Sequence, residues 1–167
     1  MKGFQVFILF ISFFLIPTFS YSKDYSDYIE ECEPIRTEIQ AIIESYGISK
    51  DYFFLLVAES HCQNRTSRAG AKGMWQMMPA TAKKYGCDDP DDLICLTHAA
   101  SKYIQHLEMK CGHDNVIFCW HDGGTNFLKK RNKVPTSGAK GLNWQFHHLI
   151  KTYYSNDWAG KDEEEQG

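Results

Sequence analysis

An acidic residue at the end of an apolar run is the feature of this sequence that could most readily do chemistry. Residues 53–58 are all apolar, and Glu59 follows them directly. Apolar surroundings penalise the ionised form of a carboxyl group, so they raise its pKa and keep it protonated near neutral pH. Such a group can act as a general acid. The alternative is that Glu59 ends a helix and simply faces water, as most glutamates do.

A second stretch contains further residues with chemical potential. Residues 70–82 read Gly-Ala-Lys-Gly-Met-Trp-Gln-Met-Met-Pro-Ala-Thr-Ala. The side-chain amide of Gln76 can both donate and accept hydrogen bonds, which suits a ligand rich in polar groups. Trp75 and Met78 offer flat or soft apolar contact surfaces, although such residues also occur frequently in protein cores.

Together these stretches resemble the goose-lysozyme-like lytic transglycosylases, the SLT family, which cleave bacterial peptidoglycan. In that family a catalytic Glu-Ser pair ends a buried helix and is followed by a Gly-x-x-Gln-x-x-Pro segment. Glu59-Ser60 and residues 73–79 match both parts in order. The resemblance implies a lysozyme-like domain in which Glu59 is the catalytic acid. The residues that it places in the glycan cleft are Ser60, Trp75, Gln76 and Met78.

Two of these assignments have structural alternatives. The hydroxyl of Ser60 could bond to a carbonyl of its own helix instead of reaching the cleft. Trp75 is equally compatible with the core and with the cleft.

The third motif of the family is usually Ala-Tyr-Asn-Ala-Gly, and its Tyr hydroxyl points at the catalytic Glu. Here the corresponding residues 119–123 read Cys-Trp-His-Asp-Gly, so Trp120 replaces the Tyr and His121 replaces the Asn. An indole N–H can donate a hydrogen bond but cannot accept one. The resemblance implies that both residues face the substrate, and it leaves open whether Trp120, His121 or a water holds Glu59. His121 could also cap the end of its helix.

Inverting and retaining glycosidases use two carboxyl groups, whereas members of this family use one. In the family the Glu protonates the leaving group and then acts as a base on the 6-hydroxyl of N-acetylmuramic acid, which closes a 1,6-anhydro ring. The resemblance implies this reaction at the β-1,4 bond to N-acetylglucosamine, with no metal or other cofactor.

Three alternatives to this reaction remain at the level of sequence. Asp122 is the one candidate second carboxyl group inside a motif, so the protein could be a hydrolysing muramidase. It could also be a non-catalytic peptidoglycan-binding module. A third alternative is a secreted, disulfide-rich helical interaction protein whose motifs are coincidental.

The N-terminal residues 1–22 have the pattern of a signal peptide. Lys2 precedes an apolar run over residues 4–16, and small residues follow. We therefore expect export to the periplasm or the exterior, with membrane contact only during export; an uncleaved anchor is the alternative. The formal net charge of −3 argues against general nucleic-acid binding. The expected partner is the peptidoglycan glycan strand, and small exported members of the family often accompany a secretion or conjugation apparatus.

All six cysteines lie after the predicted signal peptide. An even number of cysteines in an exported chain favours disulfides. No pair has Cys-x-x-Cys spacing, which argues against a zinc or redox site. Cys87 and Cys95 flank a short acidic turn and are predicted to pair, while the other four stay unassigned.

The elements that must position these residues are predicted to be helices. Apolar residues recur at helical spacing over residues 26–46, 91–107 and 144–154. The helix expected over residues 50–61 is apolar nearly all round, which predicts the most buried position for it. We therefore expect an all-α domain over residues 23–158, stabilised by disulfides, and an acidic flexible tail over residues 159–167.

Overall fold

The structure is a computed structural model that describes residues 24–124 and 126–155 of the chain. The predicted signal peptide (1–22) and acidic tail (159–167) lie outside these residues. Within the described ranges the regular elements are helices, with only isolated β-bridges in the loop before Pro79. This confirms the predicted all-α class. No helix in this part of the chain combines the length and the apolar character needed to span a bilayer.

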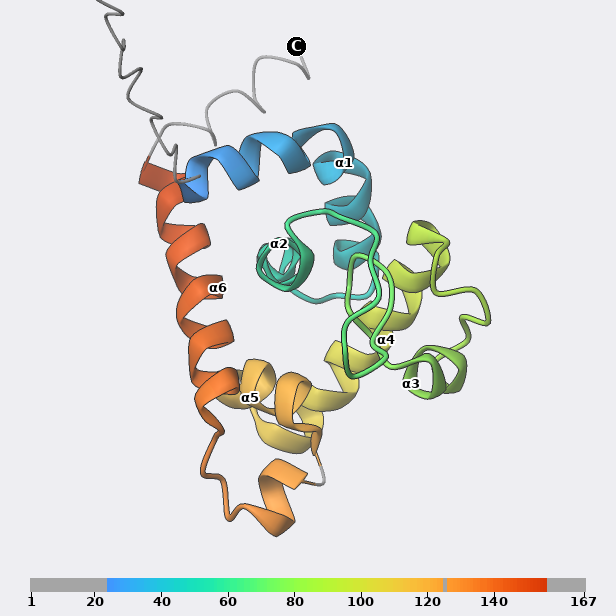
Figure 1. Cartoon of the computed structure of the whole chain (residues 1–167), viewed down its shortest axis with the longest axis vertical. Helices are drawn as coiled ribbons and strands as arrows, with labels where there is room; N and C mark the ends of the chain where they lie inside the picture. The colour runs from blue at the N-terminus through green and yellow to red at the C-terminus, as the bar shows by residue number, and fades with distance from the viewer. Residues whose placement is uncertain (1–23, 125, 156–167) are drawn as a thin grey trace, which may run out of the picture.

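A short helix at the centre of the molecule is surrounded by the others (Figure 1). This central helix, α2, is seen end-on in Figure 1, with α1, α4, α5 and α6 around it. The elements are α1 (Tyr25–Ser45), η1 (Lys50–Tyr52), α2 (Phe53–Ser60), α3 (Pro79–Lys84), α4 (Leu93–Cys111), η2 (His113–Asn115), α5 (Val116–Asp122), the π-helix η3 (Asn126–Lys130) and α6 (Ser137–Ser155).

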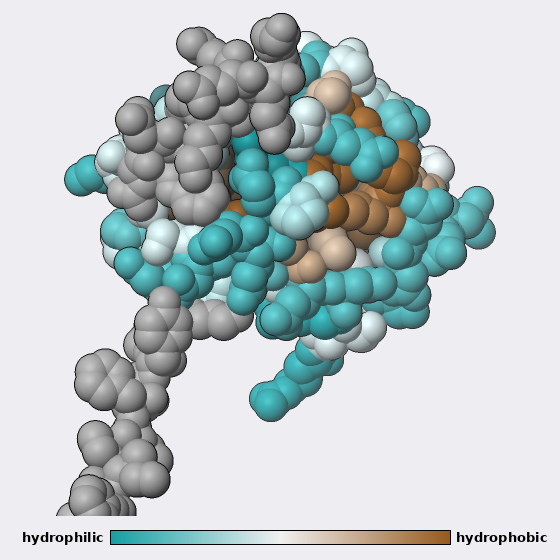
Figure 2. All heavy atoms as spheres, turned by 90° about the horizontal axis from the view of Figure 1, so that it is seen from above, coloured by the Kyte–Doolittle hydropathy of each residue, from teal (hydrophilic) through white to brown (hydrophobic). Residues whose placement is uncertain are grey.

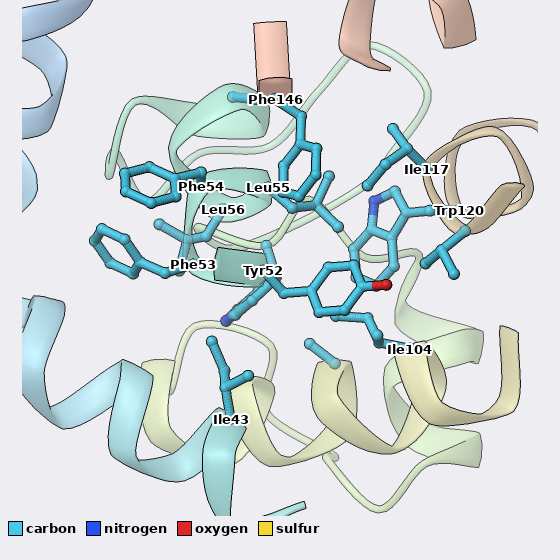
Figure 3. Close-up of a cluster of buried hydrophobic side chains, with 14 of the residues drawn as sticks. Ile43, Tyr52, Phe53, Phe54, Leu55, Leu56, Ile104, Ile117, Trp120 and Phe146 are labelled. Atoms are coloured by element: carbon cyan, nitrogen blue, oxygen red, sulfur yellow. The ribbon is translucent and has the colours of Figure 1, made fainter. Parts of the chain in front are cut away.

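The central position of α2 follows from its composition. Every residue of the range 52–58 is buried, and α2 contacts both α1 and α6. Figure 3 shows its side chains extending toward residues of several other helices, including Ile43 of α1 and Trp120 of α5. Burial of each large apolar side chain contributes about 1.5–3 kcal/mol. The position of Glu59 at the end of this helix is therefore fixed by the core.

A disulfide holds the chain in place directly after the C-terminal end of α2. His61 caps the helix in the left-handed conformation at φ 54°, and Cys62 follows at φ 57°. This reversal brings Cys62 to Cys32 of α1, and the two form a disulfide. The chain therefore leaves α2 in a defined direction immediately after Glu59.

Two further disulfides complete the described framework. Cys87 and Cys95 are bonded, which confirms the predicted pair, and Cys111 is bonded to Cys119. The second bond joins the end of α4 to α5, directly before Trp120. The Cys32–Cys62 bond therefore attaches the end of α2 to α1, and the Cys111–Cys119 bond attaches α5 to α4.

One predicted helix boundary was wrong. The last helix begins at Ser137 and not near Trp144. Thr136 caps it, because its Oγ1 accepts a hydrogen bond from the amide of Ala139 at 3.1 Å. The first turns of α6 contain Gly138 and Gly141, and glycine disfavours a helix by about 1 kcal/mol, so the sequence pattern is weak there.

Viewed from above, this end of the molecule is mainly hydrophilic, with one apolar area on one side (Figure 2). Most of the apolar residues of the described chain are instead packed in one cluster around α2. Glu59 directly follows the buried residues of α2 and is itself only partly buried, so it lies at the edge of this core.

Candidate active site

A cavity of about 510 Å³ opens at the C-terminal end of α2. It is bounded by the loop between α2 and α3, by α3, by α4 and by the end of α5. Its lining residues are Glu59, Ser67, Ala69, Ala71, Gln76, Met77, Met78, Thr81, Tyr103, Trp120, His121, Asp122 and Gly123. Residues of all three sequence motifs therefore meet around one space.

Glu59 is partly buried at the edge of this cavity. Its Oε1 accepts a hydrogen bond of 2.8 Å from the indole Nε1 of Trp120. The backbone carbonyl of Glu59 accepts a hydrogen bond of 2.7 Å from the guanidinium of Arg65. Trp120 is thus the residue that contacts the carboxyl group in the position where the family has a tyrosine.

The surroundings of Glu59 change its proton affinity. Burial raises the pKa of its carboxyl group to about 6, from an ordinary value of 4.5. The hydrogen bond from Trp120 and the positive electrostatic influence of His121 and Arg65 lower the pKa, but by less. A substantial fraction of Glu59 is therefore protonated at slightly acidic pH, as a general acid requires.

His121 also lines the cavity, next to Trp120. Its side chain is 37% exposed, and its Nδ1 lies 3.1 Å from Oδ1 of Asp122. The imidazole packs against the start of α6, where a Cβ at Gly138 would come within 2.8 Å of the ring. His121, on α5, is therefore held against the start of α6. It lowers the pKa of Glu59 electrostatically, whereas the hydrogen bond to the carboxyl group comes from Trp120.

Gln76 enters the cavity from a strained backbone position. Its φ is 49°, in the left-handed region that residues other than glycine rarely adopt. The Nε2 of Gln76 donates to the carbonyls of Gly73 at 2.7 Å and Arg65 at 2.9 Å. Strain of this kind costs about 1–3 kcal/mol and concentrates at functional sites. The amide donors are used to hold the loop, which leaves the Oε1 of Gln76 to accept from a ligand.

The loop next to Gln76 is closely packed on α4. Gly73 has a φ of 73°, and a Cβ there would come within 2.3 Å of the carbonyl of Pro90 and 2.4 Å of the side chain of Leu96. Met78, in contrast, is 47% exposed and lines the cavity. Gly73 therefore serves the packing of the loop, whereas Met78 exposes an apolar surface to the cavity, and its contact with a glycan stays a prediction.

The structure corrects two of the predicted glycan contacts. Ser60 is fully buried, and its Oγ donates to the carbonyl of Leu56 at 3.2 Å. Trp75 is also fully buried, and its Nε1 donates to Oγ1 of Thr97 at 2.9 Å. Neither side chain lines the cavity, because each follows the structural alternative available to its residue type. Trp75 supports the site from beneath, with its ring 6.0 Å from that of Trp120.

Asp122 is occupied by contacts within the protein. The amide and hydroxyl groups of Thr136 donate to its two carboxylate oxygens at 2.9 and 2.6 Å. Its side chain is only 2% exposed. Burial raises the pKa of Asp122, but the hydrogen bonds from Thr136 and His121 outweigh that effect, so its pKa lies below the ordinary aspartate value. Asp122 therefore holds the start of α6 as a carboxylate.

Sequence reasoning missed Tyr103, which lines the cavity from α4. Its ring lies 5.4 Å from that of Trp120. Burial and the nearby Tyr85 raise the pKa of Tyr103, while a hydrogen bond from the backbone of Gly124 lowers it by less. The available signal was a single hydroxyl group within the otherwise apolar stripe of this helix.

The described residues include no set of three or more His, Cys, Asp or Glu side chains placed to hold a metal ion. Comparison with protein-family models matches residues 38–143 to the transglycosylase SLT domain. The matched range contains Glu59, Gln76, Trp120 and Asp122. No curated protein and no solved structure matches the chain.

Proposed function

The chain belongs to the transglycosylase SLT domain family, which implies a lytic-transglycosylase type of action on peptidoglycan, and on this premise we propose that Glu59 alone serves as acid and base. The substrate is the β-1,4 bond between N-acetylmuramic acid and N-acetylglucosamine. The product is a glycan that ends in 1,6-anhydro-N-acetylmuramic acid.

The proposed reaction has two proton transfers through one carboxyl group. Protonated Glu59 first gives its proton to the glycosidic oxygen as the bond from that oxygen to C1 of the muramic acid breaks. The resulting carboxylate then takes the proton of the 6-hydroxyl group as that oxygen bonds to C1. Glu59 ends the cycle protonated, and no water is consumed.

The surroundings of Glu59 support both roles. Because its pKa is raised to about 6, the carboxyl group can carry the proton that the first step needs. The indole N–H of Trp120 donates to its Oε1 at 2.8 Å and stabilises the carboxylate that exists between the steps. Since an indole cannot accept a proton, Trp120 positions Glu59 without competing for the proton.

The observation that carries the single-acid proposal is the state of Asp122. It is the other acidic residue that lines the cavity, and a hydrolase would need it as a base or nucleophile. Both its oxygens already accept hydrogen bonds from Thr136, and its pKa is lowered. A carboxylate in this state is a poor base and is not free to approach a sugar.

Two further residues are proposed to bind the glycan. The free Oε1 of Gln76 accepts from a hydroxyl or N-acetyl N–H group, while the exposed Met78 packs on an apolar sugar face. His121, with a side chain 37% exposed in the cavity, offers a further polar contact.

We propose that the protein acts outside the cytoplasm. The support is the signal-peptide pattern of residues 1–22 and the three disulfides among described residues, because disulfides persist in oxidising compartments. A secretion or conjugation apparatus remains a candidate partner on the family resemblance. Detection of the protein in periplasmic or culture fractions of its host tests the location.

Product analysis tests the reaction. Purified peptidoglycan is digested with the protein, and the soluble fragments are analysed by mass spectrometry. The anhydro product is lighter than the hydrolysed one by one water. Fragments with reducing muramic acid ends as the main product would contradict the proposal and favour a muramidase. Binding without any cleavage would favour a non-catalytic module.

A further inference from the structure

The charged residues of this protein are unevenly distributed along the chain. Residues 123–155 contain six of the 18 Lys and Arg and none of the 21 Asp and Glu, so this segment carries +6 and the remainder −9. We call residues 126–136 the basic loop. It contains four of the six cations, which are Lys129, Lys130, Arg131 and Lys133. A block of like charges is often an interaction surface.

The basic loop has a defined conformation. The amide of Arg131 donates to the carbonyl of Asn126, and the amide of Lys133 donates to the carbonyl of Phe127, both at 2.9 Å. Phe127 is buried beneath the loop. At the far end, the contacts from Thr136 to Asp122 attach the loop to α5. The loop lies next to the end of α5, at the bottom of Figure 1, and presents its cations from a fixed position.

These cations have almost no acidic partner in the described chain. Arg131 is the exception, since its Nε lies 3.8 Å from Oδ2 of Asp122 and also donates to the carbonyl of Val134. Lys129, Lys130 and Lys133 are exposed and form no ion pair with a described residue. Like charges held close together repel one another, so an anion bound among them would be favoured.

The basic loop borders a second cavity, of about 370 Å³, beside the candidate active site. Its lining residues are Asp122, Asn126, Lys130, Arg131 and Thr136. Asp122 lines both cavities, so the two adjoin.

We propose that Lys130 and Arg131 bind carboxylate groups of the stem peptides while the attached glycan occupies the cavity at Glu59. The proposal rests on the proposed function, because it takes peptidoglycan as the substrate. Guanidinium and ammonium groups are the usual protein partners of carboxylates. An anionic lipid surface offers similar chemistry, but the shared boundary of the two cavities favours an anion that belongs to the substrate.

The test measures binding without catalysis. All variants are made in the full chain with the Glu59→Gln substitution. The double variant Lys130→Gln/Arg131→Gln is compared with the control Lys50→Gln/Lys151→Gln. The control removes two exposed cations, one at the start of η1 and one near the C-terminal end of α6. Each protein is co-sedimented with intact peptidoglycan and with peptidoglycan whose carboxyl groups have been converted to amides. Thermal unfolding confirms that all variants are folded.

We expect the loop variant to bind intact peptidoglycan about fivefold to tenfold more weakly than the control, because each exposed charge pair contributes up to about 1 kcal/mol. The difference should disappear on the amidated material and shrink at high salt. Lys130→Gln alone should show a smaller loss in the same direction. This single change leaves the hydrogen bonds of Arg131 intact, so it remains informative if the double variant loosens the loop.

Three outcomes would overturn the proposal. These are equal binding by loop variant and control, equal weakening on amidated peptidoglycan, or a loop-dependent preference for vesicles of phosphatidylglycerol over peptidoglycan. None of them bears on the reaction itself. Conversely, reducing-end products from the unsubstituted enzyme would refute the proposed chemistry and leave the binding result standing.

Discussion

Glu59 and Asp122 line the same cavity, and each lies at the C-terminal end of a short helix, but their surroundings have opposite effects on their protons. Glu59 accepts one described side-chain hydrogen bond, from Trp120 at 2.8 Å, and burial raises its pKa to about 6. Asp122 is also desolvated, but it accepts two hydrogen bonds from Thr136 and its pKa is lowered.

The two carboxyl groups differ in how deeply they lie in the protein and in the number of donors that compensate for lost water. Burial penalises a carboxylate, and each donated hydrogen bond offsets part of that penalty. With one donor the carboxyl group keeps its proton and can act as an acid. With several donors it is held as an anion and serves the structure. Two acids in one cavity can therefore have separate roles.

The largest expected effect is the loss of activity in Glu59→Gln. The amide is nearly isosteric but cannot transfer a proton, so the rate should fall by at least about 100-fold. Clearance of a peptidoglycan suspension measures the activity, and circular dichroism checks the fold. Glu44→Gln, at an exposed position of α1, is the matched control. A folded Glu59→Gln variant with more than about a tenth of the wild-type rate would remove Glu59 from the mechanism.

The two carboxyl groups also differ in the disulfides that anchor their helices. Replacing Cys32 and Cys62 by Ala removes a cross-link between residues 30 positions apart, just after Glu59. Replacing Cys111 and Cys119 by Ala removes one between residues 8 positions apart, next to Trp120. The chain-entropy model gives losses of about 3.6 and 2.5 kcal/mol in the free energy of unfolding. Denaturant titration of both variants measures the difference. A larger loss from the shorter loop would show that native contacts outweigh chain entropy here.

Asp122→Asn should affect stability much more than chemistry. The substitution replaces charge-assisted hydrogen bonds to Thr136 by weaker ones and turns one acceptor into a donor, which costs about 1.5–3 kcal/mol. Anhydro products should remain the main species. Denaturant titration and product masses are measured together. A folded variant that loses cleavage, or a wild-type enzyme with reducing-end products, would restore Asp122 as a second catalytic carboxyl group.

The pH dependence of stability should separate the two groups again. Folded Glu59 binds its proton more tightly than the unfolded chain, so its contribution to stability is greatest below about pH 4.5 and is lost as pH rises to about 6. Glu59→Gln should therefore be up to about 2 kcal/mol more stable than wild type above pH 6, and equal to it below pH 4.5. Asp122 acts in the opposite direction, and its contribution is lost as pH falls below the ordinary aspartate range.

Thermal unfolding of wild type and Glu59→Gln across this pH range measures the effect. A constant difference between the two proteins at all pH values would show that the pKa of Glu59 is not raised in the folded state.

The smallest expected effect is that of Trp120→Phe. Removal of the indole N–H removes a hydrogen bond that lowers the pKa of Glu59, so the pKa should rise further. We expect about a tenfold lower maximal rate. We also expect the activity to decline at a higher pH than in wild type. Trp75→Phe is the control, because it loses a buried N–H contact to Thr97 and not to Glu59. Unchanged pH profiles in both variants would contradict the role of Trp120.

Some of these features were predictable from the sequence because they depend on local pattern. The apolar run before Glu59 predicted the buried helix, since a helix that is apolar nearly all round, as over residues 53–58, is stable only inside a core. Cys87 and Cys95 are close in the sequence, so their pairing was also predictable. The start of α6 was mispredicted because its capping residue, Thr136, precedes glycines that weaken the helical pattern.

The side-chain contacts that define the site were decided only by the tertiary structure. The resemblance placed Trp120 and His121 near Glu59, but it could not say which of them would reach the carboxyl group, because the choice depends on how packing on α4 and α6 orients α5. Similarly, Asp122 became a structural anion because Thr136, 14 residues further along the chain, lies against it and donates two hydrogen bonds. Hydrogen-bond partners distant in sequence set the proton affinity of an acid, and only the folded chain brings them together.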